Sequence, residues 1–202
     1  MRRTMSGIFP MMLAAAVLAA APALASDKYV KNDDKPLDEA RRPSPGKVLV
    51  YFARPQIMGA AVKVKLFADG EFLGIISSEG YVPWEGEPGK HEFIVAAENA
   101  GFLEAELMPD KIYFVQVAIH MGAMKARTHF EVARKGSEAL EEITKKYDQL
   151  RLITTTDDGR AWVTEDKQDI DKTVAKFRAK GEEFEHLKPE DGWDGPPWAV
   201  KH

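Results

Sequence analysis

A hairpin signal between residues 62 and 76 restricts the fold of this chain more than any other feature. Apolar residues alternate with lysines from Val62 to Leu66, which is the period of a strand with one buried face and one solvated face. Asp69-Gly70 follows, and this pair readily adopts the positive φ angles of a tight hairpin turn. A return strand is expected from Phe72 to Ile76, so the region is predicted to be β-structure.

Strand patterns separated by turn residues continue on both sides of this hairpin. The run from Val48 to Phe52 is apolar throughout, which is typical of a central strand buried on both faces. A later run places four apolar side chains on one face of a strand: Tyr113, Val115, Val117 and Ile119. No helical pattern interrupts residues 46–135, and this predicts an antiparallel Ig-like β-sandwich of about seven or eight strands.

Helical spacing replaces strand spacing after residue 135. One helix is expected to begin near Ser137, because four apolar residues then share one face: Leu140, Ile143, Tyr147 and Leu150. A second helix is expected from about Glu165 to His186, with four more apolar residues at helical spacing: Ile170, Val174, Phe177 and Phe184. Residues 136–202 are therefore predicted to form two helices and a tail that contains tryptophan and proline. The helices are expected either to close the sandwich or to form a surface for a partner.

The N-terminus has the features of a secretory signal peptide. Two arginines follow the first methionine, an apolar stretch comes next, and alanines occupy positions 23 and 25, so cleavage is expected after residue 25. The apolar stretch is too short and too broken for a membrane span. Residues 26–45 are polar, charged and proline-containing, which predicts a flexible leader. The expected order is a signal peptide (1–25), a leader (26–45), a β-domain (46–135) and the helical extension (136–202).

Charge and cysteine content restrict the partners. The chain contains no cysteine, so it has neither disulfides nor the residue to which bacterial lipoproteins attach their lipid. The net charge of the chain is −4, and removal of residues 1–25 takes away two arginines, so the mature chain is more acidic still. Without a basic stripe, it is not expected to bind nucleic acid. We expect a periplasmic or secreted protein without a membrane anchor or cofactor, and its oligomeric state stays open.

An ordered set of short motifs carries a family resemblance. In chain order the motifs are Gly46-Lys-Val-Leu-Val-Tyr51-Phe52-Ala-Arg54-Pro55, Gly59-Ala-Ala, Asp69-Gly70 with Gly74, Pro88-Gly89-Lys90-His91, and Tyr113-Phe-Val-Gln-Val with Gly122. This set resembles a bacterial envelope or lipoprotein domain family of unknown function with an Ig-like β-sandwich. It is similar in strand pattern to surface-exposed domains named for a Pro-Glu-Gly-Ala motif. The resemblance implies a β-sandwich in the bacterial envelope and brings no catalytic residue, cofactor or substrate. The chain departs from the family by lacking the lipid-bearing cysteine and by its long C-terminal extension.

His120 and His129 are the candidate metal ligands. If the hairpin between their strands turns at Met124-Lys125, the two imidazoles face each other on the solvated side of the sheet. Glu131 lies on the same side, and two imidazoles with a carboxylate can hold Zn²⁺ or Cu²⁺. The alternative is two ordinary histidines on a solvated face, since Gly122 permits other turn registers.

Aromatic residues in turns and in the tail form a second candidate site. The candidate ligand-binding residues are Tyr81, Trp84, His91 and Trp162, together with Trp193 and Trp198 of the tail. Large rings bind glycans or peptides by stacking while their polar edges form hydrogen bonds. The alternative is that these rings cover the apolar core.

Two pairs of carboxylates, Glu85 with Glu87 and Glu104 with Glu106, have the residue type that a glycosidase needs. A spacing of two residues in a strand merely places both on the wet face, and no nucleophile elbow accompanies them. The leading hypothesis is therefore a non-enzymatic exported module that interacts with an envelope protein or a cell-wall component. The alternatives are a ligand-binding module for cell-wall glycan or peptide, and a hydrolase.

Overall fold

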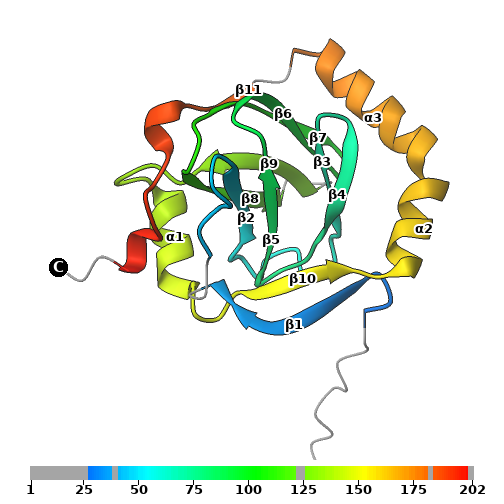
Figure 1. Cartoon of the computed structure of the whole chain (residues 1–202). Helices are drawn as coiled ribbons and strands as arrows, with labels where there is room; N and C mark the ends of the chain where they lie inside the picture. Colours follow the sequence, from blue (N-terminus) through cyan, green and yellow to red (C-terminus); the bar gives the residue numbers. More distant parts are fainter. Residues whose placement is uncertain (1–26, 38–40, 122–125, 182–183, 200–202) are drawn as a thin grey trace, which may run out of the picture.

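The computed structural model describes residues 27–37, 41–121, 126–181 and 184–199, and within them the fold is mainly β, with eleven strands in two sheets and three α-helices (Figure 1). The strands are β1 (Val30–Pro36), β2 (Val48–Arg54), β3 (Val64–Ala68), β4 (Glu71–Ile76), β5 (Gly80–Gly86), β6 (Gly89–Ala96), β7 (Ala100–Leu107), β8 (Ile112–Met121), β9 (Ala126–Val132), β10 (Arg151–Thr155) and β11 (Phe184–Leu187). The helices are α1 (Glu138–Lys146), α2 (Asp157–Glu165) and α3 (Lys167–Ala179), followed by the short 3-10 helices η2 (Pro189–Asp191) and η3 (Pro197–Ala199).

Both sheets are mixed, so the expectation of a purely antiparallel sandwich is wrong. The first sheet has the strand order β1-β10-β5-β2-β8-β9, and the second has the order β11-β7-β6-β3-β4. Three neighbouring pairs are parallel, namely β10 with β5, β2 with β8, and β11 with β7. Each parallel pair joins strands that are far apart in the sequence. A succession of short strands and turns predicts hairpins and gives no signal for such long-range pairs.

The two sheets share one apolar core. β2 is buried along its whole length, as its apolar sequence predicts. Val50 and Phe52 of β2 lie in the shared core, whereas Leu49 and Tyr51 lie in a second cluster on the outer face of the first sheet. The alternation of a strand sends successive side chains to opposite faces, so β2 contributes to apolar clusters on both sides.

The hairpin of β3 and β4 is confirmed. The two strands pair in antiparallel fashion from Val64 opposite Ile76 to Ala68 opposite Glu71. Asp69 and Gly70 between them have φ angles of 51° and 83°. Positive φ at both central positions is what a type I′ hairpin turn requires, and Asp-Gly adopts it at low cost.

α1 covers the outer face of the first sheet, where its apolar side chains join the second cluster. Ser137 begins the helix as predicted, because its hydroxyl accepts a hydrogen bond from the Leu140 amide at 3.2 Å. Ala139 and Ile143 are the buried residues of α1. The face predicted from the spacing of apolar residues is therefore the one that packs on the sheet.

The rest of the extension differs from the single second helix that was expected. Thr156 accepts a hydrogen bond from the Gly159 amide at 3.1 Å and so caps α2, a helix that was not expected. Gly181, with a φ of 69°, follows the end of α3, and Phe184 lies in β11. The extension thus contributes three helices and two strands, and α3 packs on the outer face of the second sheet through Phe177.

Part of the N-terminal segment belongs to the first sheet. β1 lies within residues 26–45, for which a flexible leader was expected, and it pairs with β10 at the sheet edge (Figure 1). Val30 of β1 is buried in the shared core. Residues 1–25, the expected signal peptide, lie outside the described residues. Among the described helices, none has the length and apolar character needed to cross a membrane.

Candidate functional site

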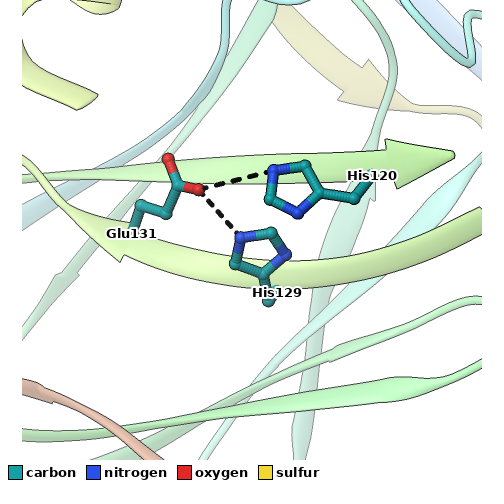
Figure 2. Close-up of side chains that lie close together, drawn as sticks. All are labelled: His120, His129 and Glu131. Atoms are coloured by element: carbon teal, nitrogen blue, oxygen red, sulfur yellow. Dashed lines mark hydrogen bonds and ion pairs between the residues drawn. The ribbon is translucent and has the colours of Figure 1, made fainter. Parts of the chain in front are cut away.

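Three potential metal ligands converge on the outer face of the first sheet. His120 lies near the end of β8, and His129 and Glu131 lie on the edge strand β9. Figure 2 shows both imidazoles beside the Glu131 carboxylate. The distance to Glu131 Oε1 is 2.8 Å from His129 Nε2 and 3.9 Å from His120 Nε2. These residues, named the histidine cluster below, each offer a ligand atom within 4.8 Å of the other two.

The register of β8 and β9 differs from the one expected but keeps the same face. Ala118 lies opposite His129, and Arg127 lies opposite His120. The two histidines are therefore diagonal neighbours rather than direct partners. Their side chains still share a face, because a register shift of two residues preserves the side on which each residue lies. The turn expected at Met124-Lys125 lies outside the described residues.

The cluster is charged and open to solvent. The hydrogen bond from His129 lowers the pKa of the Glu131 carboxyl, although partial burial of the carboxyl acts in the opposite direction. The Glu131 side chain is therefore an ionised acceptor at neutral pH. The exposed fraction of the side chain is 67% for His120 and about half that for the other two residues, so an ion in solution can reach all three.

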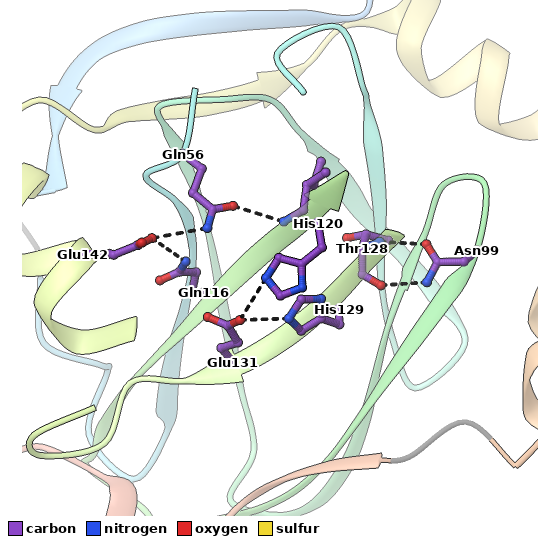
Figure 3. A network of polar contacts seen from close by, with 9 residues as sticks. Gln56, Asn99, Gln116, His120, Thr128, His129, Glu131 and Glu142 are labelled. Carbon is purple, nitrogen blue, oxygen red and sulfur yellow. Dashed lines mark hydrogen bonds and ion pairs between the residues drawn. The ribbon is translucent and has the colours of Figure 1, made fainter. Parts of the chain in front are cut away.

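Polar networks fix the strands on both sides of the cluster (Figure 3). Asn99, in the turn between β6 and β7, accepts a hydrogen bond from the Thr128 amide at 2.7 Å and donates to the Thr128 carbonyl at 2.8 Å. On the other side, the amide groups of Gln116 and Gln56 both donate to Glu142 Oε2, at 2.7 and 3.3 Å. The first network ties β9 to the second sheet, and the other ties β8 to α1.

The residues singled out as an aromatic site do not form one surface. Tyr81 is buried in the outer cluster, with its ring centroid 5.8 Å from that of Tyr51. Trp162 lies on α2, stacks on Tyr29 at 4.6 Å and has the Lys65 ammonium 3.8 Å from its ring centroid. Both rings pack against apolar clusters, so they do not belong to one binding surface.

Trp84 and His91 do form a pair, with ring centroids 4.9 Å apart. His91 Nδ1 lies 2.7 Å from Asp69 Oδ2, and its Nε2 lies 2.9 Å from the Glu87 carbonyl oxygen. Both ring nitrogens are therefore engaged in linking the β3–β4 turn to the β5–β6 turn. The pair supports two adjacent turns and leaves no imidazole nitrogen free for a ligand.

The tail tryptophans line a groove of about 690 Å³ between α1 and the C-terminal tail, named the tail groove below. Its apolar lining consists of Leu140, Tyr147, Trp193, Pro197 and Trp198. Trp193 exchanges two backbone hydrogen bonds with Ile112 at the start of β8, at 2.8 and 2.9 Å. Trp198 stacks on Tyr147 with ring centroids 5.1 Å apart. The sequence predicts a binding role for both tryptophans. For Tyr147 it predicts only a position on a helix face, because no local pattern places this residue beside the tail.

The paired carboxylates have partners that do not suit hydrolysis. Glu85 forms an ion pair with Arg41, and Glu87 forms one with Lys47. Hydrogen bonds from Ser44, together with Arg41, lower the pKa of Glu85 to about 2. A carboxyl with so low a pKa is not a general acid at neutral pH. The other pair, on β7, consists of exposed side chains on one strand face.

Comparison with known proteins does not supply a function. No model of a known protein family matches the chain, and no curated protein matches it. The functional inference therefore rests on the two surfaces that bring suitable side chains together, the tail groove and the histidine cluster.

Proposed function

We propose that the protein is an exported, non-enzymatic accessory module of the cell envelope that binds an apolar segment of a partner polypeptide in the tail groove. The groove itself carries this proposal, because it presents stacked aromatic rings beside an aliphatic helix face. Grooves with such linings recognise apolar side chains of peptides. Export rests on the signal-peptide pattern of residues 1–25.

The orientation of the indole rings favours a peptide over a glycan. The indole N–H groups of Trp193 and Trp198 are buried and have no partner among the described residues. Sugar-binding platforms combine ring stacking with hydrogen bonds from polar ring edges. Here the polar edges are shielded, so the groove offers mainly apolar ring surface. An apolar peptide side chain needs only that surface.

The rim of the groove indicates the charge of the partner segment. Lys135 and Lys145 line the rim together with Glu141. Glu141 is already paired with Lys145 at 3.4 Å, whereas Lys135 makes no ion pair with a described residue. The unpaired positive charge of Lys135 lies beside an apolar groove. It favours a partner segment in which an acidic residue follows the apolar residue that enters the groove.

Two exposed residues of the α1 region allow a matched test. Thr144 lines the groove, and Gln149 lies beyond the helix outside the groove lining. In Thr144→Phe the new ring occupies the groove, while Gln149→Phe adds the same exposed ring elsewhere. The wild-type mature chain and both variants are immobilised and exposed to the envelope fraction of the source cells.

A polypeptide captured by the wild type and by Gln149→Phe, but lost with Thr144→Phe, supports the proposal. Tryptophan fluorescence is then titrated with that polypeptide and, in parallel, with purified cell-wall muropeptides. Quenching by muropeptides that Thr144→Phe abolishes would instead make the protein a glycan-binding module. Capture that is the same for all three proteins would contradict a role for the groove.

The motifs of residues 46–135 support the placement in the envelope. They resemble the bacterial envelope domain family described above, and the Asp69-Gly70 hairpin that forms part of them is confirmed. We propose that β2 to β9 correspond to the Ig-like sandwich of that family. On this proposal, β1, β10 and β11 are strands added at the sheet edges.

A further inference from the structure

We propose that His120, His129 and Glu131 form a binding site for a borderline divalent transition-metal ion of the Zn²⁺ and Cu²⁺ class. The three side chains come from two adjacent strands and gather around one carboxylate oxygen (Figure 2). This site lies on the outer face of the first sheet near the edge strand, and none of its residues lines the tail groove. It is therefore independent of the function proposed for that groove.

The distances from the two imidazoles to the carboxylate fit a tetrahedral ion after small movements. With metal–ligand bonds of about 2.0–2.2 Å, the ligand atoms of a tetrahedral site lie about 3.3 Å apart. The two imidazole nitrogens lie 2.8 and 3.9 Å from Glu131 Oε1, one on each side of that value. Movements of about half an ångström bring both distances to the tetrahedral value. The ion would replace the proton through which His129 now bonds the carboxylate.

A purely structural role explains only part of this arrangement. The hydrogen bond between His129 and Glu131 is complete without a third residue. His120 lies beyond hydrogen-bond distance of the carboxylate, yet its ring centroid is only 4.4 Å from that of His129. The His120 imidazole thus lies at a distance from the carboxylate that a shared ion can bridge and a shared proton cannot.

The scaffold holds the ligands in place before an ion arrives. β8 and β9 pair in continuous register through the segment that carries the three residues. The Asn99 side chain makes two hydrogen bonds to the backbone of Thr128, the neighbour of His129 (Figure 3). Ligands on paired strands with fixed neighbours lose little freedom on binding, which favours affinity.

The ligand set selects the class of ion. Two imidazoles and one carboxylate suit Zn²⁺, Cu²⁺ and Ni²⁺, whereas Mg²⁺ and Ca²⁺ require a shell of oxygen ligands. Three protein ligands leave a coordination position for water or for an external group. Both histidines and Arg127 line a cleft of about 310 Å³. The open coordination position is therefore accessible from solution.

The test uses the untagged mature chain and a matched control. Zn²⁺ and Cu²⁺ are titrated by calorimetry into the wild type, His120→Gln, His129→Gln and Glu131→Gln. His186→Gln is the control, because His186 also lies beside a carboxylate, with its Nδ1 3.5 Å from Glu104 Oε2, but no described residue adds a third ligand to that pair. Circular dichroism confirms that each variant keeps its β-structure.

We expect one ion per wild-type chain and the same for His186→Gln. Each single variant of the cluster should lower the affinity at least tenfold, and the double variant His120→Gln, His129→Gln should not bind. The electron paramagnetic resonance spectrum of the Cu²⁺ form should show coupling to two nitrogens, and to one in either single histidine variant. Absence of Zn²⁺ and Cu²⁺ uptake by the folded wild type would overturn the proposal. Unchanged affinity in the folded double variant would also overturn it.

Discussion

Arg54 offers the sharpest test of how the β2–β3 loop is held. Its side chain is fully buried, and its guanidinium donates to three loop carbonyls, those of Val62 at 2.7 Å, Gly59 at 2.7 Å and Met58 at 3.2 Å. Burial lowers the pKa of Arg54 to about 10, so the group is still charged at neutral pH. We therefore expect Arg54→Met, which keeps an apolar stem of similar shape, to release the loop.

The magnitude follows from the carbonyls that lose a partner. The Gly59 carbonyl keeps a hydrogen bond from the Val62 amide at 2.8 Å, and Met58 is an exposed residue whose carbonyl can bond water instead. The Val62 carbonyl therefore loses most. An unpaired buried polar group costs about 1–3 kcal/mol. Part of this cost is offset because a charged guanidinium no longer has to be buried. The expected loss of unfolding free energy is about 1–3 kcal/mol, which lowers Tm by about 2–12 °C for a chain of this size.

Urea denaturation followed by circular dichroism measures the change, with Arg54→Lys as the control. Lysine keeps the charge but lacks the planar fork that reaches several carbonyls at once, so its loss should be intermediate. Amide hydrogen exchange should be faster in residues 56–63 of Arg54→Met. A variant within about 0.5 kcal/mol of the wild type, with unchanged exchange in the loop, would refute the reasoning.

Three further substitutions test other contacts. In Gly159→Ala the new Cβ would lie 2.3 Å from the Tyr29 carbonyl oxygen, so we expect a loss of about 1–3 kcal/mol in urea and faster exchange in β1; unchanged exchange would contradict that contact. Asn99→Ala removes two buried hydrogen bonds to Thr128 and should cost about 2–3 kcal/mol, measured in the same way. Glu85→Gln should cost about 1 kcal/mol at pH 7, because Glu85 is near the surface. Its lowered pKa gives stability that is present above the unfolded pKa and lost as pH falls toward about 2, so the difference between wild type and Glu85→Gln should shrink across that range.

Local periodicity predicted those parts of the fold that depend on local geometry. The β3–β4 hairpin, the burial of β2 on both faces and the start of α1 at Ser137 all follow from the spacing of residues a few positions apart. The parallel pairing of β2 with β8 depends instead on which distant strand lies beside β2. Nothing in either strand encodes that choice, because any two apolar strands can pair.

β1 and β11 escaped prediction for another reason. β1 reads Val-Lys-Asn-Asp-Asp-Lys-Pro, and it lies at the edge of the first sheet, where one side of the strand has no neighbour. Charged residues are common on edge strands because they discourage further pairing. The polar and charged composition from which a flexible leader was predicted for residues 26–45 is therefore also typical of an edge strand. β11 is short, and it lies at the edge of the second sheet.

The two candidate sites differ in how far the sequence indicates them. The shared face of His120, His129 and Glu131 follows from strand alternation and survives the change in register. The tail groove depends on Tyr147 and Trp198, which meet only because the tail bonds to the start of β8. Tyr81 lies in β5 and Trp162 lies on α2, and they pack against different apolar clusters, which no local pattern in the sequence predicts.

The positions of both sites follow from how the extension closes the first sheet. β10 lies between β1 and β5, and Ile143 and Leu150 are buried on the outer face of that sheet, so residues 136–202 are part of the fold rather than an appendage. Deleting them would remove an interior strand and uncover the apolar side chains of β2. α1 and the tail cover the apolar part of this face, and the tail groove lies where they meet. Toward β9 the face carries charged and polar residues, which need no cover, and the histidine cluster lies there within reach of solvent.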